Sequence, residues 1–359
     1  MNGLKNLTKR ALFLPIFCMI LVLLINLAKS PTFFSVAIQN GVLYGRLIDI
    51  LNRGSEIAIL AVGQTLVVAV SAGTDISVGS VMSLSACGCC MMLAGYGVNS
   101  ATQLAVPMIV GMLFGVLLGG VSGAFNGALV SKLKIQPMVA TLILYTAARA
   151  IGLLLCDNQI TYIRYEPYKY LGNFLPGFPV PTAILVTVAV VAVVSLLLKR
   201  TALGLYVQSV GINSRAARIS GINSDKICFL CYLLCGLCAG IAGIVASSRI
   251  YSADSNNIGL NYELDAILAV ALGGNSLAGG KFNMAGSIIG AYTIQAITTT
   301  LLAMGVSTDQ APVIKAVIVI LIVVVQAPVF KAWMLRRSAR KLALASAADT
   351  EQGKGMPVR

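Results

Sequence analysis

Residues 199–226 read KRTALGLYVQSVGINSRAARISGINSDK, and they lie between apolar windows long enough to cross a bilayer. Gly204, Gly211 and Gly221 punctuate a short amphipathic pattern rich in Ala and Arg. Such a pattern suits docking on a soluble partner better than burial in lipid. The stretch therefore predicts a membrane protein that carries a cytoplasmic docking loop.

The composition of the whole chain agrees with a membrane protein. Hydrophobic residues make up 58% of the 359 residues and charged residues only 11%, and the mean hydropathy is +0.89. A soluble protein of this composition would expose too much apolar surface. The net charge of +14 does not indicate nucleic-acid binding, because the basic residues lack interleaved aromatic platforms and fit the positive-inside rule.

The nine cysteines lie in apolar segments, where a thiol behaves as a small hydrophobic group, so we expect no disulfide framework. Cys228, Cys231, Cys235 and Cys238 have CxxC spacings that resemble a metal motif. On one straight helix the outer pair is about 15 Å apart, and the chain has no histidine, so we expect no metal site.

The apolar windows predict an all-α, polytopic membrane protein with about ten transmembrane helices. Eight windows are continuous: 11–28, 55–72, 104–125, 137–155, 181–198, 227–247, 285–302 and 312–329. Two shorter windows, 78–95 and 264–274, adjoin polar, Gly-rich breaks and are interpreted as discontinuous helices. Residues 1–335 then form a single transmembrane domain, and the basic residues 336–359 a flexible cytoplasmic tail.

Lysine and arginine predict the orientation. With both termini in the cytoplasm, 18 of the 26 basic residues fall inside, six outside, and two within spans. The first outer segment is basic at Arg46 and Arg53, so residues 33–52 are interpreted as an interfacial helix. The first window lacks a convincing cleavage site, and we expect it to be an anchoring span.

Glycines repeat every four residues in the window 104–125 and just beyond it. This ladder removes the side chains from one helix face and lets another backbone approach closely. Its members are Gly111, Gly115, Gly119, Gly123 and Gly127. The ladder predicts a tightly packed helical core.

Two polar breaks, GTDISVG at residues 73–79 and LGGNS at residues 272–276, interrupt the apolar pattern in the two halves of the chain. Backbone freed at membrane depth must be surrounded by protein or water, as in a transport path. Asp75, Ser77, Asn275 and Ser276 are therefore candidate path residues. The alternative for Asp75 and Ser77 is that they only cap a helix.

Three more polar residues lie within predicted spans. Gln64 and Asn126 are neutral hydrogen-bonding groups, which suit a polyhydroxylated solute better than an ion. Arg149 shares a helix face with Thr141 and must face protein or water, which makes it a candidate path residue by default. Its alternative role is snorkelling to the interface near Asp157.

The residues give no support for catalysis. The sequence GNSLAGGKF, residues 274–282, differs from a phosphate loop in spacing and lacks Ser or Thr after its lysine. The spans contain no carboxylate pair and no nucleophile with a base, which argues against an intramembrane hydrolase and against proton-coupled transport.

Four segments resemble the inner-membrane permease family of bacterial ABC sugar importers, the ribose, galactofuranose and autoinducer-2 group. They are GTDISVGSVMSLSA (73–86), KIQPMVATLILYTAARAIGLLL (134–155), RTALGLYVQSVGINSRAARISGINSDK (200–226) and ELDAILAVALGGNSLAGGKFNMAGSIIGA (263–291). The phrases GRLIDILNR (45–53) and DSNNIGLNYELDAILAV (254–270) most resemble the galactofuranose branch. Thr74 and the Cys-rich run 87–90 depart from the family pattern.

The resemblance implies a non-catalytic transport subunit of the bacterial inner membrane. Its partners would be a second permease, identical or homologous, an ABC ATPase that uses ATP, and an extracytoplasmic sugar-binding protein; the chain itself would bind no cofactor. The loop 199–226 would dock on the ATPase through the positions that match the family's coupling segment: Gly211, Asn213, Ala216, Ala217, Arg218 and Gly221. The substrate would be a pentose or hexose, including galactofuranose.

A self-contained secondary carrier or channel for a small polar solute is the alternative function. A carrier needs an ion-coupling charge in the middle of a span, whereas a permease subunit needs a docking loop without a nucleotide motif. The sequence meets the second requirement.

Overall fold

The computed structural model describes residues 12–29, 31–39 and 41–326. The chain divides into two compact units, residues 1–305 and 306–359. In the second unit the described part contains α14 (Ala311–Gln326). The predicted tail, 336–359, and the domain boundary before it lie outside the described residues.

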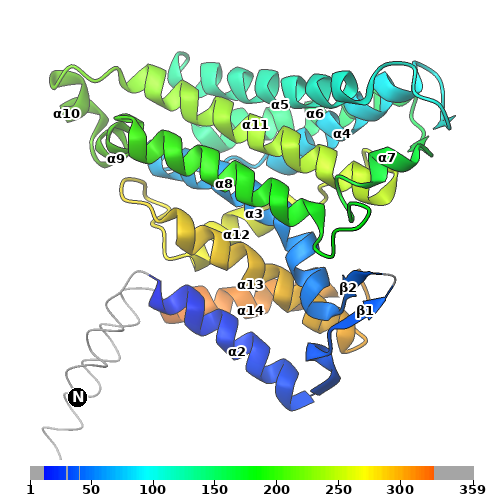
Figure 1. Cartoon of the computed structure of the whole chain (residues 1–359). Helices are drawn as coiled ribbons and strands as arrows, with labels where there is room; N and C mark the ends of the chain where they lie inside the picture. The colour runs from blue at the N-terminus through cyan, green and yellow to red at the C-terminus, as the bar shows by residue number, and fades with distance from the viewer. Residues whose placement is uncertain (1–11, 30, 40, 327–359) are drawn as a thin grey trace, which may run out of the picture. The chain divides into compact units, whose positions relative to one another are not determined.

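The first unit is built mainly from helices (Figure 1). Its long helices are α2 (Phe13–Lys29), α3 (Arg46–Ser71), α4 (Val78–Ala94), α5 (Met108–Ser131), α6 (Pro137–Leu155), α8 (Thr182–Arg200), α11 (Ser224–Ile250) and α13 (Met284–Ala303). Its shorter ones are η1 (Pro31–Phe34), α7 (Glu166–Lys169), α9 (Leu203–Ile212), α10 (Ser214–Ile219) and α12 (Tyr262–Leu272).

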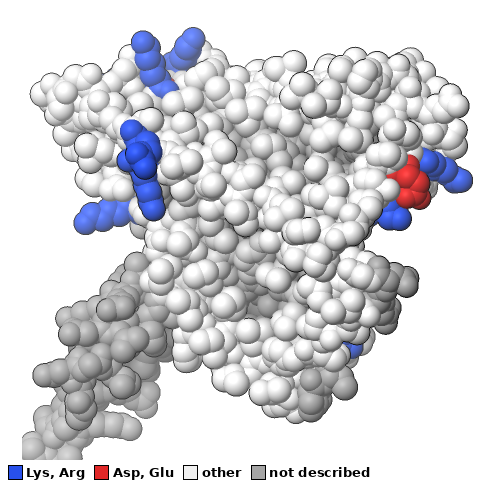
Figure 2. All heavy atoms as spheres, in the orientation of Figure 1, with Lys and Arg blue, Asp and Glu red and all other residues white. Residues whose placement is uncertain are grey.

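The described part of each of the ten apolar windows falls mainly on a helix, so the chain is mostly helical, as predicted, with two small sheets besides. Six of these helices, α3, α5, α6, α8, α11 and α13, are long and apolar enough to cross a membrane. On the face shown in Figure 2, charged side chains gather mostly at two opposite ends, and the wide surface between them carries no charge. Ten crossings and the cytoplasmic placement of the termini stay predictions.

Helix α3 lies at the centre of the unit. It packs against α11 on one side and α13 on another, and it also contacts α8, α9 and α12 (Figure 1). Residues 54–70 are buried without interruption, although they include Glu56, Gln64 and Thr65. A helix buried all round can hold polar side chains only where other parts of the protein satisfy them.

The glycine ladder of α5 faces α11, as the sequence predicts. A Cβ at Gly119 would lie 2.5 Å from the carbonyl oxygen of Gly236 and 2.8 Å from the Cα of Gly240. The opposite face of α5 exposes Leu113, Leu117 and Val121. The two helices therefore cross backbone to backbone through glycines on both sides, and the branched side chains remain for lipid.

The interfacial helix predicted over residues 33–52 is wrong. A short hairpin of β1 (Ala37–Gln39) and β2 (Val42–Tyr44) occupies its middle, with Ile38 opposite Leu43, and α3 begins at Arg46. The dipeptide Asn40-Gly41 is a strong hairpin signal that the hydropathy reading overlooked, and Gly41 adopts the positive φ of 78° that such turns favour. A second small sheet joins β3 (Ser100–Ala101), β4 (Thr161–Ile163) and β5 (Ser252–Ala253).

The glycine crossing gives a matched pair of substitutions on α5. We expect Gly119→Ala to lower the free energy of unfolding by about 1–3 kcal/mol, because the new methyl group meets backbone atoms of α11 that cannot move separately. Gly120→Ala is the control, since its Cβ would meet the flexible side chain of Leu237 at 2.9 Å. Thermal unfolding in detergent measures both, and equal midpoints would show that the crossing is looser than described.

Candidate functional site

The carboxylate of Asp75 organises the first break, which separates α3 from α4. Its Oδ1 accepts hydrogen bonds from the backbone N–H of Ser77 (2.8 Å) and from the Ser77 hydroxyl (2.6 Å). From α5, Nδ2 of Asn126 donates to the Ser77 hydroxyl (2.9 Å) and to Oδ2 of Asp75 (3.5 Å). All three side chains are buried. The Ser77 hydroxyl makes no capping bond to α4, so the simple capping alternative does not describe it.

Two further helices hold the same break. With its amide oriented to match its neighbours, Gln64 of α3 donates to the carbonyl oxygen of Asp75 (3.2 Å) and accepts from the Asp75 N–H (3.0 Å). Thr141 of α6 accepts from the backbone N–H of Ile76 (3.2 Å). The structure thus brings Gln64, Asp75, Ser77 and Asn126 together in one buried network, and their role in lining a path stays a prediction.

Asn275 organises the second break, which separates α12 from α13. Its Nδ2 donates to the carbonyl oxygen of Val270 (3.0 Å) and to the hydroxyl of Ser287 (2.8 Å), and its Oδ1 accepts from the N–H of Asn283 (2.5 Å). The neighbouring Ser276 accepts only a local bond, from the N–H of Ala278 (3.2 Å). Both are candidate path residues in the sequence; in the structure Asn275 fixes the break and Ser276 lies at its surface, and a role of either in the path stays a prediction.

Helix α3 also reaches this second network. The hydroxyl of Thr65 donates to Ser287 (2.7 Å), and the carbonyl oxygen of Ala69 accepts from the N–H of Gly280 (2.9 Å). Adjacent residues of α3, Gln64 and Thr65, therefore face different breaks, about 100° apart around the helix. The sequence analysis missed Thr65 and Ser287, because a Thr or Ser in an apolar helix more often bonds its own backbone.

Arg149 belongs to neither network. Its Nη1 donates to the carbonyl oxygens of Ser255 (2.6 Å) and Asn256 (3.1 Å), in the link between α11 and α12. The Ser255 hydroxyl donates back to the carbonyl oxygen of Arg149 (2.8 Å). The guanidinium therefore faces protein, as expected of an intramembrane arginine, and it fastens α6 to this link rather than snorkelling toward Asp157.

The predicted coupling segment forms α9 and α10, joined at Asn213. The Asn213 side chain caps α10, because its Oδ1 accepts from the N–H groups of Arg215 and Ala216 (both 3.1 Å). Gly221 then turns the chain with a φ of 83°, and Ala217 is buried. These positions give the segment a fixed shape, in which Ile212 and Ile219 remain 66% and 90% exposed.

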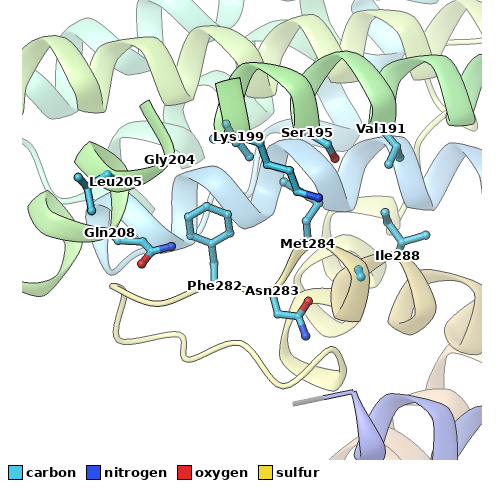
Figure 3. Close-up of a pocket in the computed structure, with 12 residues that line it drawn as sticks. Val191, Ser195, Lys199, Gly204, Leu205, Gln208, Phe282, Asn283, Met284 and Ile288 are labelled. Carbon is cyan, nitrogen blue, oxygen red and sulfur yellow. The ribbon is translucent and has the colours of Figure 1, made fainter. Parts of the chain in front are cut away.

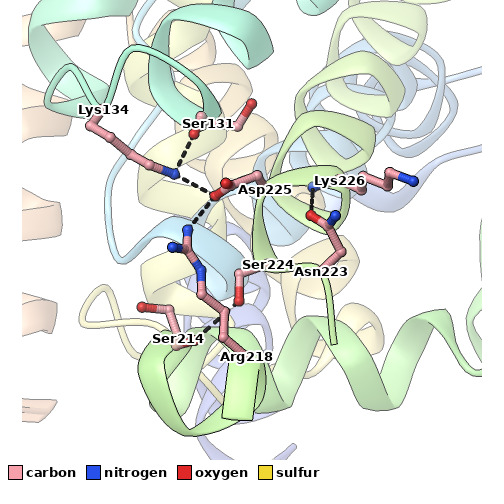
Figure 4. Close-up of polar contacts among 8 residues, drawn as sticks. All are labelled: Ser131, Lys134, Ser214, Arg218, Asn223, Ser224, Asp225 and Lys226. Atoms are coloured by element: carbon pink, nitrogen blue, oxygen red, sulfur yellow. Dashed lines mark hydrogen bonds and ion pairs between the residues drawn. The ribbon is translucent and has the colours of Figure 1, made fainter. Parts of the chain in front are cut away.

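An ion cluster anchors α10 to the membrane helices (Figure 4). The Asp225 carboxylate, at the start of α11, pairs with Arg218 of α10 (2.5 Å) and with Lys134 from the α5–α6 link. The Ser224 hydroxyl donates to the carbonyl oxygen of Ser214 (3.1 Å). Arg218 is half-exposed, so it contributes to this anchor and still presents surface to a partner.

The coupling segment touches α3 directly. A Cβ at Gly211 would lie 1.8 Å from the carbonyl oxygen of Ala69 and 2.7 Å from the backbone nitrogen of Gly280. Only glycine permits this approach. Gly211 thus joins α9 to the end of α3 and to the second break at one point.

A cavity of 510 Å³ opens beside this contact, between the end of α8, α9 and the start of α13 (Figure 3). Its walls are mostly apolar, and Lys199 extends from α8 toward Asn283 and Met284. The cavity separates the coupling segment from α13 on this side, while α9 is held by its packing against α3, α8 and α11.

The sequence does not predict the buried ion pair that Arg249 forms with Glu56. Nη2 of Arg249, near the end of α11, lies 2.8 Å from Oε1 and 3.0 Å from Oε2 of Glu56 on α3. The Glu56 side chain is 1% exposed and that of Arg249 15%. The partners are 193 residues apart, and no local pattern signals their pairing.

Comparison with known proteins identifies related chains. Residues 46–325 match the family described as the permease component of branched-chain amino acid transport systems. The galactofuranose transporter permease protein of Escherichia coli is 42% identical over 87% of this chain and 88% of its own length. The fructose import permease protein of Bifidobacterium longum (91% and 90% covered) and the ribose import permease protein of Escherichia coli (82% and 87%) are each 35% identical. No solved structure matches.

The contrast between Asn275 and Ser276 can be measured. We expect Asn275→Ala to lower the free energy of unfolding by about 1–3 kcal/mol, because it leaves the N–H of Asn283 and the hydroxyl of Ser287 without this partner. Ser276→Ala should change it by less than about 0.5 kcal/mol. Thermal unfolding of the two variants in one detergent compares them. Equal losses would show that Asn275 does not hold the break.

Proposed function

We propose that this chain, which belongs to the family of permease components of branched-chain amino acid transport systems, forms the translocation path for a monosaccharide in an ATP-driven importer. As a family member, the chain is a multi-pass transport subunit of the bacterial inner membrane and not an enzyme. The family description names amino acids, but the relatives that match along most of the chain are named for galactofuranose, fructose and ribose. A neutral pentose or hexose is therefore the proposed substrate.

One observation carries the proposal: the coupling segment rests directly on the helix that holds both breaks. Gly211 of α9 meets Ala69 of α3, and α3 supplies Gln64 to one break and Thr65 to the other. A partner that moves α9 therefore acts on both networks through one buried helix. In an importer, this arrangement transmits a conformational change of the ATPase to the translocation path.

The chemistry around the first break suits a sugar. Gln64, Ser77 and Asn126 offer neutral donors and acceptors, which can exchange their bonds for those of hydroxyl groups. Oδ1 of Asn126 has no hydrogen-bond partner among residues 12–29, 31–39 and 41–326, so one acceptor there is unused. We place Asp75 in this path as the group that orders the break, and Asn275 and Arg149 as positioning residues around it.

The exposed surface of α9 and α10 indicates the kind of partner that the chain binds. An ABC ATPase docks on α9 and α10, where exposed Ile212 and Ile219 offer apolar contacts and Arg218 a charge. ATP is bound and hydrolysed by that partner, and this chain binds no cofactor. A second permease, identical or homologous, completes the membrane core, and an extracytoplasmic binding protein delivers the sugar.

Purification of the tagged chain from its native membrane, with mass spectrometry of the proteins that accompany it, tests the proposal. We expect an ABC ATPase and ATP-dependent uptake of a monosaccharide in reconstituted vesicles. Recovery of the chain alone, with uptake that survives ATP depletion, would overturn the proposal in favour of a secondary carrier.

A charge exchange within the anchor tests the docking role. We expect Arg218→Glu to reduce the co-purified ATPase about fivefold, because it breaks the pair with Asp225 and sets two carboxylates side by side. The triple variant Arg218→Glu/Asp225→Arg/Lys134→Glu restores opposite charges at both ion pairs of residue 225. Rescue by the triple variant assigns Arg218 to holding α10 in place, whereas continued loss assigns it to direct contact with the ATPase. Unchanged recovery from the single variant would contradict docking on α10.

A further inference from the structure

A charged pocket of 410 Å³ lies at the end of α11 opposite the coupling segment. Asp225 begins α11 beside α10, and Arg249 lies 24 residues further along, about 35 Å at the rise of an α-helix. Figure 1 shows α10 and α7 at opposite ends of this long helix. The pocket therefore faces the side away from the proposed ATPase.

The wall of this pocket combines charged, amide and aromatic groups. Asp49, Asn52 and Arg53 come from the first turns of α3, while Lys169 and Asn173 come from α7 and the residues after it. Two aromatic rings, Tyr44 of the hairpin and Phe174, lie with their centroids 6.1 Å apart. A few convergent polar groups beside aromatic faces are typical of a small-molecule site.

The buried ion pair lies beside this pocket. A second cavity of 130 Å³ is lined by Glu56, Arg249, Asn257 and Tyr262, and Arg249 and Ile250 line both spaces. Arg249 thus lies between the outer pocket and the carboxylate of Glu56. Both cavities adjoin α3, and Glu56 lies eight residues before Gln64 of the first network.

Two residues that line the outer pocket each carry a buried polar atom without a partner in the described part of the chain. The atoms are Nη1 of Arg249, a donor, and Oδ1 of Asn52, an acceptor. A buried donor or acceptor without a partner has lost its bonds to water without replacement, so both atoms destabilise the ligand-free chain. A ligand that both accepts from the guanidinium and donates to the amide would remove this destabilisation.

The mixture of charges limits the class of ligand. An anion that binds Arg249 would meet the carboxylates of Glu56 and Asp49, and a cation would meet Arg53, Lys169 and Arg249. A neutral molecule with adjacent hydroxyls avoids both conflicts, because each hydroxyl donates and accepts. Neighbouring hydroxyls can bridge a carboxylate and a guanidinium at the same time.

We propose that the pocket formed by Asn52, Arg249 and the aromatic pair Tyr44 and Phe174 is an outer binding site for a neutral monosaccharide. This inference rests on the proposed function, and it names where the sugar first meets the membrane chain. The Arg249–Glu56 pair orients the hydroxyls, and the aromatic rings pack against the apolar face of the sugar. From this site the sugar enters the path along α3.

Cysteine protection tests the site in the assembled transporter. Asn52→Cys is labelled from outside with a membrane-impermeant maleimide, with D-ribose, D-fructose or D-galactose present at high concentration. The wild-type chain controls for native thiols, eight of which are buried. We expect at least one of these sugars to slow labelling of Cys at position 52 about threefold or more. No protection by any of the three would overturn the site.

Transport kinetics supply a second, independent measurement. We expect Asn52→Ala to raise the KM of ATP-dependent sugar uptake about 5- to 10-fold with little change in maximal rate, since a bond to the sugar is lost and no hydrogen bond to Oδ1 within the described chain is broken. Arg164→Gln, an exposed change outside the pocket lining, should leave KM unaltered. Equal KM values for wild type and Asn52→Ala would overturn the site.

The buried pair needs a variant that keeps the fold. Removing one partner leaves the other charge buried, so Glu56→Gln and Arg249→Gln are combined in one chain. We expect this double variant to assemble with the ATPase and to show no sugar protection at position 52. One outcome is that the wild type imports a sugar in an ATP-dependent way while the Asn52→Ala and Glu56→Gln/Arg249→Gln variants leave KM and protection unchanged. That result overturns the outer site and leaves the proposed function standing. If the wild type imports none of the three sugars, the proposed function fails for them, and the protection result alone decides the site.

Discussion

The structure depends on the need to satisfy polar backbone at membrane depth, and α3 is the element that meets it. Both breaks free N–H and C=O groups that lipid cannot bond. Three successive residues of α3 serve three neighbours: Gly63 lets α11 approach, with the Cα of Cys235 only 2.8 Å from a Cβ built there, Gln64 bonds the first break, and Thr65 bonds the second. Since successive residues of a helix point about 100° apart, one buried helix can hold all three at once. Without these bonds, each break would leave unpaired polar groups in the core, at a cost of several kcal/mol.

Glycine packing makes this arrangement stiff. The α5–α11 crossing brings backbone against backbone, and the same kind of approach joins α9 to the end of α3 at Gly211. Packed helices of this sort shift as bodies instead of deforming, so movement at the coupling segment reaches the centre of the unit. The cavity between α8, α9 and α13 leaves room beside that contact, whereas the Asp225 cluster restrains α10 on the other side.

The helices, the glycine crossing and part of the first network could be predicted from the sequence, for physical reasons that differ between them. The apolar windows predicted the long helices, because the thickness of the membrane sets the length of a helix that crosses it. The glycine ladder predicted a close crossing. The first polar break gave Asp75 and Ser77, and the polar residues of the spans gave Gln64 and Asn126, which meet them in one network. The hairpin at residues 37–44 was not predicted, because hydropathy does not report turns and the turn signal here is the dipeptide Asn40-Gly41. The Glu56–Arg249 pair and the Thr65–Ser287 bond join residues far apart in the chain, and no local pattern encodes such contacts. The difference between Asn275 and Ser276 likewise depends on which side chain faces α13 after folding.

The central claim is that α3 links the docking segment to both breaks. Hydrogen exchange of the purified complex of this chain with its ATPase, with and without a non-hydrolysable ATP analogue, tests it most directly. Occupancy of the ATPase should change exchange at residues 73–77 and 273–283 together, because both bond to α3. A change confined to α9 and α10, with both breaks unaffected, would contradict the claim.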